Sequence, residues 1–305
     1  MDQGNASVKI FMYHRVVTED TPFVLSKHKN TGTTVSRRMF AAQIERLTER
    51  YTIIPLDDAL AILKNNSPID RAYCVITFDD GYSDNYHNAF PVLQHFGATA
   101  TFFIMGSCLV GSGYIRWLDE YYYMLDQTRV TATLLHMKGD RFPRLISPRG
   151  RWERRLTDLV RRWPHEDKDA LIAALRVALK VDVPRNLLNS QLYLSAPQIQ
   201  EMHHAGMTIG AHTMTHPFAL GHLPAETARQ EVIRSVDVVR ELTNQVYVPF
   251  AYPWGDPASY NRDIINLLKE IGAECAVTTA PGNNGSDTPP FELKRIAVYE
   301  GTEIQ

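Results

Sequence analysis

The sequence predicts an α/β fold built on a parallel β-sheet with helices packed on both faces. Short apolar segments alternate along the chain with longer amphipathic ones, which is the pattern of successive β/α units. The short segments are apolar at nearly every position, as expected for strands that are covered on both faces. A chain of 305 residues with 44% hydrophobic and 22% charged residues is large enough to bury such a sheet without a disulfide scaffold.

Eight segments have the length and composition of buried strands. They are residues 8–13, 52–55, 73–78, 99–104, 207–211, 246–252, 275–278 and 293–298. In parallel α/β folds the carboxyl ends of the strands meet at one edge, and ligands bind there. Polar residues directly after these segments are therefore the first candidates for a functional site.

Amphipathic helices are predicted between the strands. Residues 36–50 and 225–242 each carry apolar side chains at helical spacing on one face. Asn244 is a suitable stop for the second of these helices. Ser195 followed by Pro197 predicts another helix start, because serine caps a helix and proline suits its first turn.

The alternation breaks between residues 106 and 194. This stretch shows no strand pattern, and we expect helices near 117–125, 152–162 and 168–179 to follow one another as a helical insertion. Eight arginines lie between residues 141 and 163. They suit a solvated helical face, or alternatively a docking surface for an acidic polymer or a partner.

Composition excludes several classes of protein. The 32 Lys+Arg and 34 Asp+Glu leave a net charge of -2, so nucleic acid and anionic membranes exert no global attraction. Cys74, Cys108 and Cys275 lie far apart without Cys-x-x-Cys spacing, so neither a cysteine-ligated zinc nor a disulfide framework is predicted. No apolar run approaches the roughly 18 residues of a membrane span, and the first residues lack the features of a signal peptide. From the sequence as written, we expect a cytoplasmic protein without a membrane span.

Two adjacent carboxylates follow one of the predicted strands. Asp79 and Asp80 come directly after residues 73–78 and precede Gly81. Neighbouring carboxylates at a strand exit repel one another, so we expect a positive charge or a metal ion to neutralise them. A second Asp-Asp pair, at 57–58, fits the start of a surface helix. The position of the first pair at a strand exit is what favours a functional role.

Two histidines follow another predicted strand. His212 and His216 come after residues 207–211, and Pro217 disfavours a continuing helix. Two neutral imidazoles and one carboxylate form a common open zinc site, which leaves a coordination position for water and substrate. The spacing alone is weak evidence, and surface histidines on a turn are the alternative.

A third feature is an aromatic turn after the predicted strand 246–252. Its sequence from Phe250 to Asp256 is Phe-Ala-Tyr-Pro-Trp-Gly-Asp. Proline and glycine shape the turn, while Tyr252 and Trp254 suit either stacking on a sugar ring or packing at the end of the sheet.

Taken in order, these motifs resemble a known family. The segments T-F-D-D-G at 77–81, H-T-x-x-H at 212–216 and the Pro-aromatic-Gly turn at 253–255 resemble the polysaccharide deacetylases of carbohydrate esterase family 4. The family includes deacetylases of chitin, peptidoglycan and poly-N-acetylglucosamine. Residues 11–16 and 293–298 also resemble one bacterial branch of it.

The resemblance implies an architecture. It covers about residues 8–104 and 195–300, and it leaves the helical insertion at 106–194 outside. We therefore expect a single catalytic domain over residues 1–305, folded as a distorted (β/α) barrel of about seven parallel strands with that insertion. Because the insertion leaves from the carboxyl end of a strand, we expect it above the barrel mouth, where it could set substrate length.

The resemblance also implies roles for the motif residues. Asp79 is expected to be the general base, and Asp80, His212 and His216 are expected to bind zinc, although cobalt, nickel or iron also suits this ligand set. The backbone N–H of Trp254 is expected to stabilise the oxyanion. Tyr82, Tyr252 and Trp254 are further expected as substrate or oxyanion contacts, with Trp117 as another stacking candidate.

Two departures from the family pattern lead to two further hypotheses. The arginine that many members place beside the catalytic aspartate is replaced by Ala251, so we predict that Arg295 reaches Asp79 from the last strand. The late Leu-x-His that supplies a general acid in many relatives is missing, since no histidine follows His222. His14 is our candidate replacement or a substrate contact, and a structural histidine at the barrel rim is the alternative.

The function that follows is a zinc-dependent hydrolase that removes the N-acetyl group of an N-acetylated amino sugar and releases acetate. The substrate is expected to be an N-acetylated polysaccharide, oligosaccharide or glycoconjugate. The alternatives are a hydrolase of small non-sugar amides or cyclic ureides, and a carbohydrate-binding relative that has lost catalysis. A protein that only binds sugars would not need the full set of Asp79, Asp80, His212 and His216.

Overall fold

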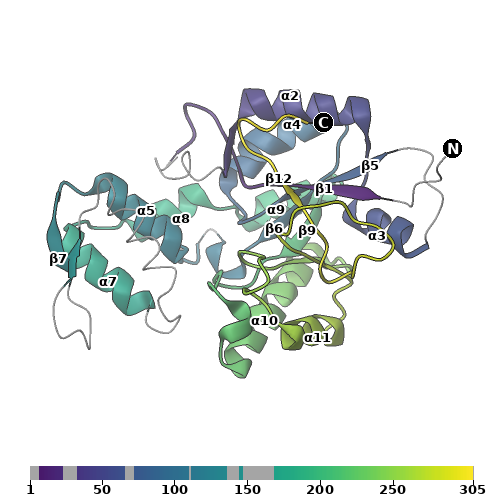
Figure 1. Ribbon diagram of the computed structural model, residues 1–305. Helices are drawn as coiled ribbons and strands as arrows, with labels where there is room; N and C mark the ends of the chain where they lie inside the picture. Colours follow the sequence, from purple (N-terminus) through teal and green to yellow (C-terminus); the bar gives the residue numbers. More distant parts are fainter. Residues whose placement is uncertain are drawn as a thin grey trace.

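The computed structural model describes residues 7–22, 33–65, 72–109, 111–135, 144–146 and 168–304. Its centre is a curled sheet of parallel strands surrounded by helices (Figure 1). The strand order is β11-β10-β9-β6-β5-β1-β12, and a further strand, β4, also pairs with β5. The strands are β1 (Val8–Tyr13), β4 (Thr52–Ile53), β5 (Tyr73–Phe78), β6 (Thr101–Ile104), β9 (Thr208–Ala211), β10 (Phe250–Ala251), β11 (Ala276–Val277) and β12 (Ile296–Ala297).

All pairings in this sheet are parallel, which confirms the predicted α/β class. The sheet also approaches closure. The N–H of Thr278 donates to the carbonyl oxygen of Leu293 (2.8 Å), and β12, just beyond Leu293, pairs with β1. The two ends of the sheet are thereby joined, and the fold is the distorted (β/α) barrel that was expected.

Several strands are shorter than predicted, most clearly the one expected at 246–252, which is reduced to Phe250–Ala251. Pro249 precedes it and has no backbone N–H to donate to a neighbouring strand. The carbonyl oxygen of Pro249 still accepts a hydrogen bond from the N–H of Ala211 (2.9 Å). Apolar composition therefore extends beyond the part of the chain that can pair.

The helices around the barrel begin and end where the capping residues predict. Ser36 accepts a hydrogen bond from the N–H of Met39 (3.2 Å), and Ser195 forms a capping box with Gln198. Asn244 ends a helix in the left-handed conformation, with φ of 55°. The helices are α2 (Arg37–Arg50), α3 (Leu56–Asn65), α4 (Phe90–His95), α9 (Ala196–His204), α10 (Ala225–Thr243) and α11 (Arg262–Glu270).

The barrel strands bury both of their faces. Val75 of β5, Phe103 of β6 and Ala251 of β10 belong to an inner core that also includes side chains of α3. Their neighbours Phe78 and Phe102 face outward and stack on each other with ring centroids 4.7 Å apart. The two buried faces explain why the strands read as continuous apolar runs.

The insertion projects from the barrel as a separate lobe (Figure 1). Helices α5 and α7 share a hydrophobic core around Tyr121 and Leu175. Its elements are α5 (Trp117–Gln127), β7 (Thr133–Leu135), β8 (Arg144–Ile146), α7 (Lys168–Leu179) and α8 (Arg185–Leu192).

The prediction that the insertion contains no strand is wrong, because β7 and β8 pair antiparallel. Each of these strands has three residues, which is too short to produce a recognisable alternation in the sequence. The helix predicted at 152–162 lies outside the described residues. So do the arginines of the predicted arginine-rich face, except for Arg144, which begins β8.

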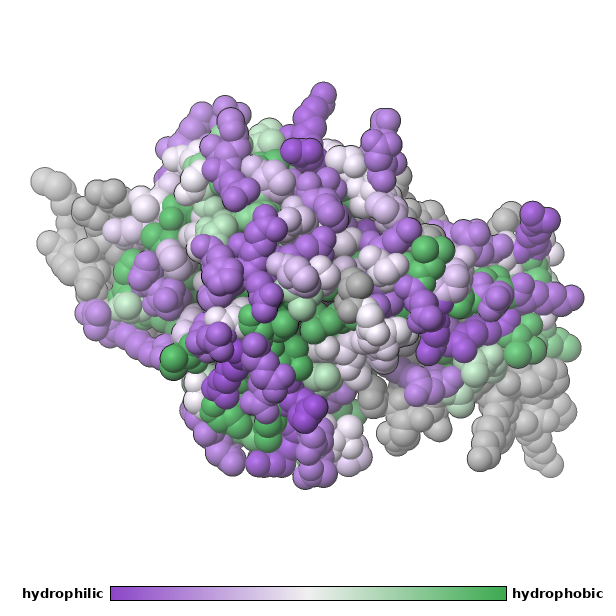
Figure 2. Space-filling model, turned by 180° about the vertical axis from the view of Figure 1, so that it is seen from behind, coloured by the Kyte–Doolittle hydropathy of each residue, from purple (hydrophilic) through white to green (hydrophobic). Residues whose placement is uncertain are grey.

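The outer surface is mostly hydrophilic, with smaller hydrophobic patches, on the face shown in Figure 2. Among the described helices, none combines the length and hydrophobicity needed to cross a membrane.

A buried ion pair connects the exit of β1 to the turn that follows β5. Arg15, in the short strand β2 (Arg15–Val17), donates from Nε to Asp84 (2.8 Å), and Asp84 also accepts from the N–H of Val16 (2.9 Å). Both Arg15 and Asp84 are 1% exposed. Next to them, the side-chain amide of Asn85 donates to the carbonyl oxygen of His14 (2.8 Å).

We expect Asp84→Ala to lower the free energy of unfolding by about 3–5 kcal/mol, because it leaves the buried guanidinium of Arg15 without its carboxylate. Urea denaturation followed by circular dichroism measures the change. Asp84→Asn keeps an acceptor for Val16 and should cost less. A change below about 1 kcal/mol in Asp84→Ala would show that this pair does not hold the two segments together.

Candidate active site

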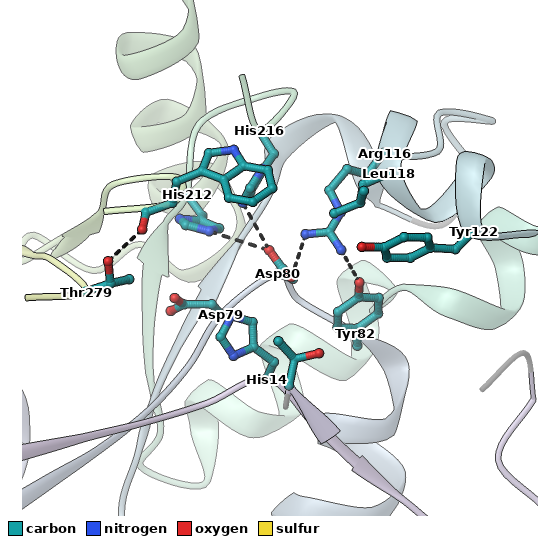
Figure 3. Close-up of a pocket in the computed structure, with 12 residues that line it drawn as sticks. His14, Asp79, Asp80, Tyr82, Arg116, Leu118, Tyr122, His212, His216 and Thr279 are labelled. Carbon is teal, nitrogen blue, oxygen red and sulfur yellow. Dashed lines mark hydrogen bonds and ion pairs between the residues drawn. The ribbon is translucent and has the colours of Figure 1, made fainter. Parts of the chain in front are cut away.

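A cavity of about 190 Å³ lies at the carboxyl ends of the barrel strands (Figure 3). Its walls come from strand exits and from α5 of the insertion, so segments far apart in the sequence meet there. The lining residues are His14, Thr33, Asp79, Asp80, Tyr82, Arg116, Leu118, Tyr122, His212, His216, Trp254 and Thr279.

Asp79 and Asp80 enter the cavity from a tight turn after β5. The N–H of Asp79 donates to the carbonyl oxygen of Tyr13 (3.1 Å), which extends the pairing of β1 with β5 by one residue. Asp80 and Gly81 then adopt φ of 74° and 63°. Aspartate tolerates this left-handed conformation, and a side chain at Gly81 would also meet Ile104 at 3.3 Å. The abrupt turn lets the two neighbouring carboxylates face different partners.

Asp79 forms a buried, two-point ion pair with Arg295. The guanidinium donates from Nη1 to Oδ1 and from Nη2 to Oδ2, each at 2.7 Å, and its Nε donates to the carbonyl oxygen of Thr278 (2.8 Å). Asp79 is 3% exposed and Arg295 is 1% exposed. The predicted contact between Arg295 and Asp79 is therefore present. Burial alone would raise the pKa of Asp79, but the charge and hydrogen bonds of Arg295, together with the nearby histidines, hold that pKa below its ordinary value.

Asp80, His212 and His216 form a buried cluster with the donor atoms of a metal site. Asp80 Oδ1 lies 3.5 Å from His212 Nε2 and 3.4 Å from His216 Nε2. The three ligand atoms all lie within 4.8 Å of one another. In the part of the chain that the structure describes, no other group of this kind is found.

The protonation of this cluster suits a cation. His212 Nδ1 lies 2.8 Å from the carbonyl oxygen of Ala251, which must accept, so Nδ1 carries the proton and Nε2 presents a lone pair to the cluster. Burial lowers the pKa of His216 to about 3, so its ring is neutral. Asp80 Oδ1 is buried and has no hydrogen-bond partner among the described residues. An anionic oxygen without a donor, facing two imidazole nitrogens, fits a divalent metal ion.

The loop that carries the two histidines is held in an uncommon conformation. Thr213 and His216 both have positive φ, at 61° and 56°. Glu231 of α10 stabilises the loop, because its carboxylate accepts hydrogen bonds from the N–H groups of Met214 and Thr215, each at 2.9 Å. Thr213 Oγ1 accepts a further bond from the N–H of His216 (3.1 Å). Nothing in the sequence pattern indicated this role for Glu231, which lies on a different element from the loop.

His14 lies at the edge of the cavity, directly after β1 (Figure 3). It is half-buried, and its ring forms no hydrogen bond within the described chain. Burial lowers the pKa of this imidazole, although Asp79 and Asp80 act in the opposite direction. The structure thus brings His14 to the carboxylates, as its position in the sequence suggested.

The aromatic turn places Trp254 beside the cluster of Asp80, His212 and His216. Trp254 has φ of 64°, and its ring lies 5.6 Å from that of His216. The turn is anchored to the next strand exit, since Thr279 Oγ1 donates to the carbonyl oxygen of Trp254 (2.7 Å). Trp117, the other predicted stacking residue, is 6% exposed and packs against Trp254 at 6.5 Å. It supports the turn and does not present a free ring face.

The prediction that Tyr252 contacts substrate is wrong. Ala251 faces the barrel interior, so the next residue along the strand faces outward. The N–H of Tyr252 donates to Val277 (3.2 Å), its hydroxyl donates to the carbonyl oxygen of Phe291 (3.0 Å), and its ring stacks on Tyr260 at 4.1 Å. Both of its polar groups are used in the fold, and the side chain is fully buried away from the cavity.

Tyr82 lines the cavity but does not suit sugar stacking. It is 1% exposed, and its ring contacts Tyr193 at 5.9 Å and the Arg15 guanidinium at 4.6 Å. Its hydroxyl donates to Asp119 (2.8 Å) and accepts from Arg116. The expected role of Tyr82 as a stacking surface is therefore corrected to that of a buried link between these groups.

Arg116, which lies just before α5, also lines the cavity and was not predicted from the sequence. Its Nη1 donates to Asp80 Oδ2 at 2.6 Å, and the two side chains are 6% and 5% exposed. An arginine within an insertion gives no sequence signal for such a contact. The one local sign in the sequence is the three-residue spacing of Arg116 and Asp119, which suits an ion pair between them.

Comparisons with known proteins agree with this geometry. A family model described as polysaccharide deacetylase matches residues 66–137 and 173–276, which together are more than half of the chain. The residues between these two segments, 138–172, fall within the insertion. A Bacillus subtilis relative, YxkH, provisionally named a polysaccharide deacetylase, is 21% identical over 299 residues, covering 97% of this chain and 73% of YxkH.

Solved structures share the fold. The Streptococcus pyogenes deacetylase PplD, determined in complex with acetate, aligns with a TM-score of 0.63 at 20% identity, over 98% of this chain and 95% of PplD. IcaB from Ammonifex degensii aligns with a TM-score of 0.60 at 19% identity, over 97% of this chain and 93% of IcaB. At these identities the structural likeness establishes only the barrel fold, and the match to the family model assigns the chain to a family. The protein belongs to the polysaccharide deacetylase family, carbohydrate esterase family 4.

Proposed function

We propose that the protein is a metal-dependent hydrolase that removes the acetyl group from an N-acetylated amino sugar and releases acetate. The observation that carries the proposal is the meeting of two buried units in one cavity. One unit is the Asp79–Arg295 pair, and the other is the cluster of Asp80, His212 and His216. A base beside a cation site is an arrangement that can hydrolyse an unactivated amide.

The proposed metal ligands are Asp80 Oδ1, His212 Nε2 and His216 Nε2. Zinc suits this donor set, and cobalt or nickel suits it as well. Bound there, a divalent cation supplies Lewis-acid chemistry, because it polarises the amide carbonyl and lowers the pKa of a water molecule. The neutral imidazole of His216 and the buried carboxylate of Asp80 support this assignment.

Asp79 is proposed as the general base. It takes a proton from the attacking water while the oxygen of that water bonds to the acetyl carbon. Arg295 is proposed to hold both carboxylate oxygens in place and keep Asp79 ionised. The backbone N–H of Trp254 is proposed to donate to the oxyanion that forms. When the C–N bond breaks, acetate and a free amine leave.

The proton for the leaving amine has two possible donors in this site. His14 lies at the cavity edge beside Asp79, and Asp79 itself carries a proton after the first step. We assign His14 as this general acid, once it has taken up the proton that Asp79 removed from water, or as a contact to the substrate, since its ring nitrogens are free of hydrogen bonds to described residues. Either role needs His14 at the reacting amide.

We expect His14→Ala to lower kcat/KM for acetate release by about 10²-fold or more, as for the loss of a proton-transfer group. Steady-state kinetics with an N-acetylglucosamine oligomer gives the value, and His14→Gln tests whether a hydrogen bond alone suffices. Wild-type kinetics in the alanine variant would leave only a structural role at the barrel rim for His14.

The proposed function is tested by an acetate-release screen with the full chain. The panel compares N-acetylglucosamine oligomers with small N-acetyl amides and cyclic ureides, and elemental analysis reports the metal carried by the same preparation. Acetate release from the sugar oligomers supports the proposal. Activity confined to the small amides or ureides, or sugar binding without any acetate release, would replace it by one of those alternatives.

Metal removal should abolish turnover. Dialysis against a chelator is expected to reduce acetate release to background, and stoichiometric zinc, cobalt or nickel should restore it, because the cation is the proposed source of the polarised carbonyl and of the activated water. Elemental analysis before and after dialysis is the accompanying measurement. Full activity in a preparation shown to be metal-free would contradict the proposed role of the cluster.

A further inference from the structure

The two oxygens of Asp80 face different partners. Oδ1 points to the imidazole nitrogens of His212 and His216, at 3.5 and 3.4 Å. Oδ2 accepts a hydrogen bond from Arg116 Nη1 at 2.6 Å. Figure 3 shows the carboxylate between the histidines on one side and the guanidinium on the other. One oxygen is therefore directed to the proposed cation, and the other is already bound.

Arg116 is itself held on its remaining edges. Its Nε donates to Asp119 Oδ2 (3.1 Å) and its Nη2 donates to Asp119 Oδ1 (3.0 Å), while Nη2 also donates to the hydroxyl of Tyr82. The backbone N–H of Arg116 donates to the hydroxyl of Tyr193 (3.1 Å). Asp119 in turn accepts from both tyrosine hydroxyls, at 2.8 and 2.7 Å, and is fully buried.

This network spans the boundary between the barrel and the insertion. Asp80 and Tyr82 follow β5 of the barrel, whereas Arg116, Asp119 and Tyr193 belong to the insertion. The junction also has its own apolar core, which includes Tyr82, Ile115 and Tyr193. The position of the Asp80 carboxylate thus depends on how the insertion is seated on the barrel.

We propose that Arg116 is a positioning residue of the metal centre, which holds Asp80 so that it offers the cation one oxygen, Oδ1. The insertion is then part of the metal centre as well as a wall of the cavity. This inference rests on the cation site of the proposed function. It adds a residue that lies outside the motif ligands and contacts the cation only through Asp80.

Asp80 needs a positioning residue because the torsion angle of its carboxylate is only weakly restrained. The χ2 angle of aspartate is broad, so an unrestrained Asp80 would rotate and share its oxygens between several arrangements. Arg116 removes that freedom through a short charge-assisted bond, and the planar fork of the guanidinium binds Asp119 at the same time. Groups that orient a metal ligand typically change metal affinity or activity by about 10–100-fold.

Charge repulsion between Arg116 and the cation acts in the opposite direction. The guanidinium is paired with Asp119 through two hydrogen bonds, so the cation would face a neutral pair instead of an isolated positive charge. Removal of Arg116 would also leave Asp80 Oδ2 buried without a donor, which is unfavourable. On removal of Arg116 we therefore expect the lost orientation of Asp80 to weaken metal binding more than the lost repulsion between Arg116 and the cation strengthens it.

The test measures binding of the metal itself. The full chain is stripped of metal, and Kd values for Zn²⁺ and Co²⁺ are determined by competition with a chromophoric chelator. Arg116→Met is expected to raise both Kd values by about 10–100-fold. Arg116→Lys keeps the charge but lacks the planar fork that binds Asp80 and Asp119 at once, so it should lie between Arg116→Met and the wild type. Tyr82→Phe, which removes the hydroxyl that contacts both Arg116 and Asp119, should weaken binding in the same direction.

A matched control and a second measurement distinguish a change in the orientation of Asp80 from a general disturbance of the insertion. Arg185→Met removes another arginine of the insertion, one that is 45% exposed and pairs with Glu120, and it should leave the Kd values unchanged. The d–d absorption spectrum of the Co²⁺ protein reports ligand geometry, and we expect it to differ from wild type in Arg116→Met but not in Arg185→Met.

Tighter or unchanged metal binding in Arg116→Met, with an unaltered Co²⁺ spectrum, would overturn the inference. If Arg116→Met fails to fold by circular dichroism, Arg116→Lys and Tyr82→Phe decide in the same way, and wild-type Kd values in both overturn it. A wild-type chain that binds neither Zn²⁺ nor Co²⁺ is a different result, because it removes the cation site of the proposed function together with this inference.

Discussion

Replacement of Asp79 by asparagine is expected to lower kcat for acetate release by about 10²–10⁴-fold, the range for loss of a positioned general base. The amide has nearly the shape of the carboxylate but does not accept a proton from water. In the folded protein Asp79 is ionised and is held by Arg295 at 2.7 Å on both oxygens, so the proposed base is oriented before substrate binds. Single-turnover measurements of acetate release give the rate of the chemical step.

Metal content provides the control for this variant. Asp79 is outside the Asp80–His212–His216 cluster, so Asp79→Asn should retain the metal that the wild type carries. Because the change leaves Arg295 buried with a neutral partner, a lower melting temperature is also expected, and rates are compared below it. Near-wild-type kcat in a folded, metal-loaded Asp79→Asn protein would remove Asp79 from the role of base.

Arg295→Ala tests the same unit from its other side. A sharp fall in kcat is expected, because the carboxylate loses both of its charge-assisted bonds, and Arg295→Lys should restore little of it, since lysine cannot form the paired contact. Unchanged turnover would mean that Arg295 serves only the fold, through its bond to Thr278.

His212→Ala is expected to give the largest loss of metal binding. The variant removes one of three proposed ligands, and we expect Kd for Zn²⁺ to rise by more than about 100-fold, beyond the effect of altering a residue that only orients a ligand. His212 is oriented for this role, since its Nδ1–H donates to the carbonyl oxygen of Ala251 at 2.8 Å and Nε2 faces Asp80. Elemental analysis and chelator competition on the purified variant measure the change.

An exposed histidine of the same region supplies the comparison. His222 lies outside the cavity, and His222→Ala should keep both the metal and the activity of the wild type. Retention of tightly bound metal by His212→Ala would show that the cation is held elsewhere. The assignment of Asp80 and His216 would then fall with it.

The replacement of the family arginine has a simple geometric basis. Ala251 belongs to the inner core of the barrel, so a longer side chain at this position would also extend into the barrel interior. In this chain Arg295, which precedes β12, reaches the same carboxylate and also lies over the ring of Phe103 at 5.8 Å. The interior of a barrel is shared by all its strands, so more than one strand can deliver a cation to one point.

Local patterns in the sequence were sufficient for most elements of the barrel. β1 and β5 have the predicted bounds, and the start of α9 and the end of α10 follow from their capping residues. The two three-residue strands of the insertion were missed because so short a segment has no period. The bounds of β10 were too wide because apolar composition continues where Pro249 prevents pairing.

The sequence by itself determined which chemical groups stand at the strand exits. A strand followed by Asp79 and Asp80, and another followed by His212 and His216, must present them at one edge, because parallel strands share their carboxyl ends. Tertiary structure decided which way the side chains point and what lies against them. Tyr252 faces outward and Ala251 faces inward. The sequence does not show this difference, because both faces of the strand are apolar. The role of Arg116 could not be predicted, because its contact with Asp80 depends on how the insertion packs on the barrel. The burial of both charges is likewise a property of the packed molecule and not of any local segment.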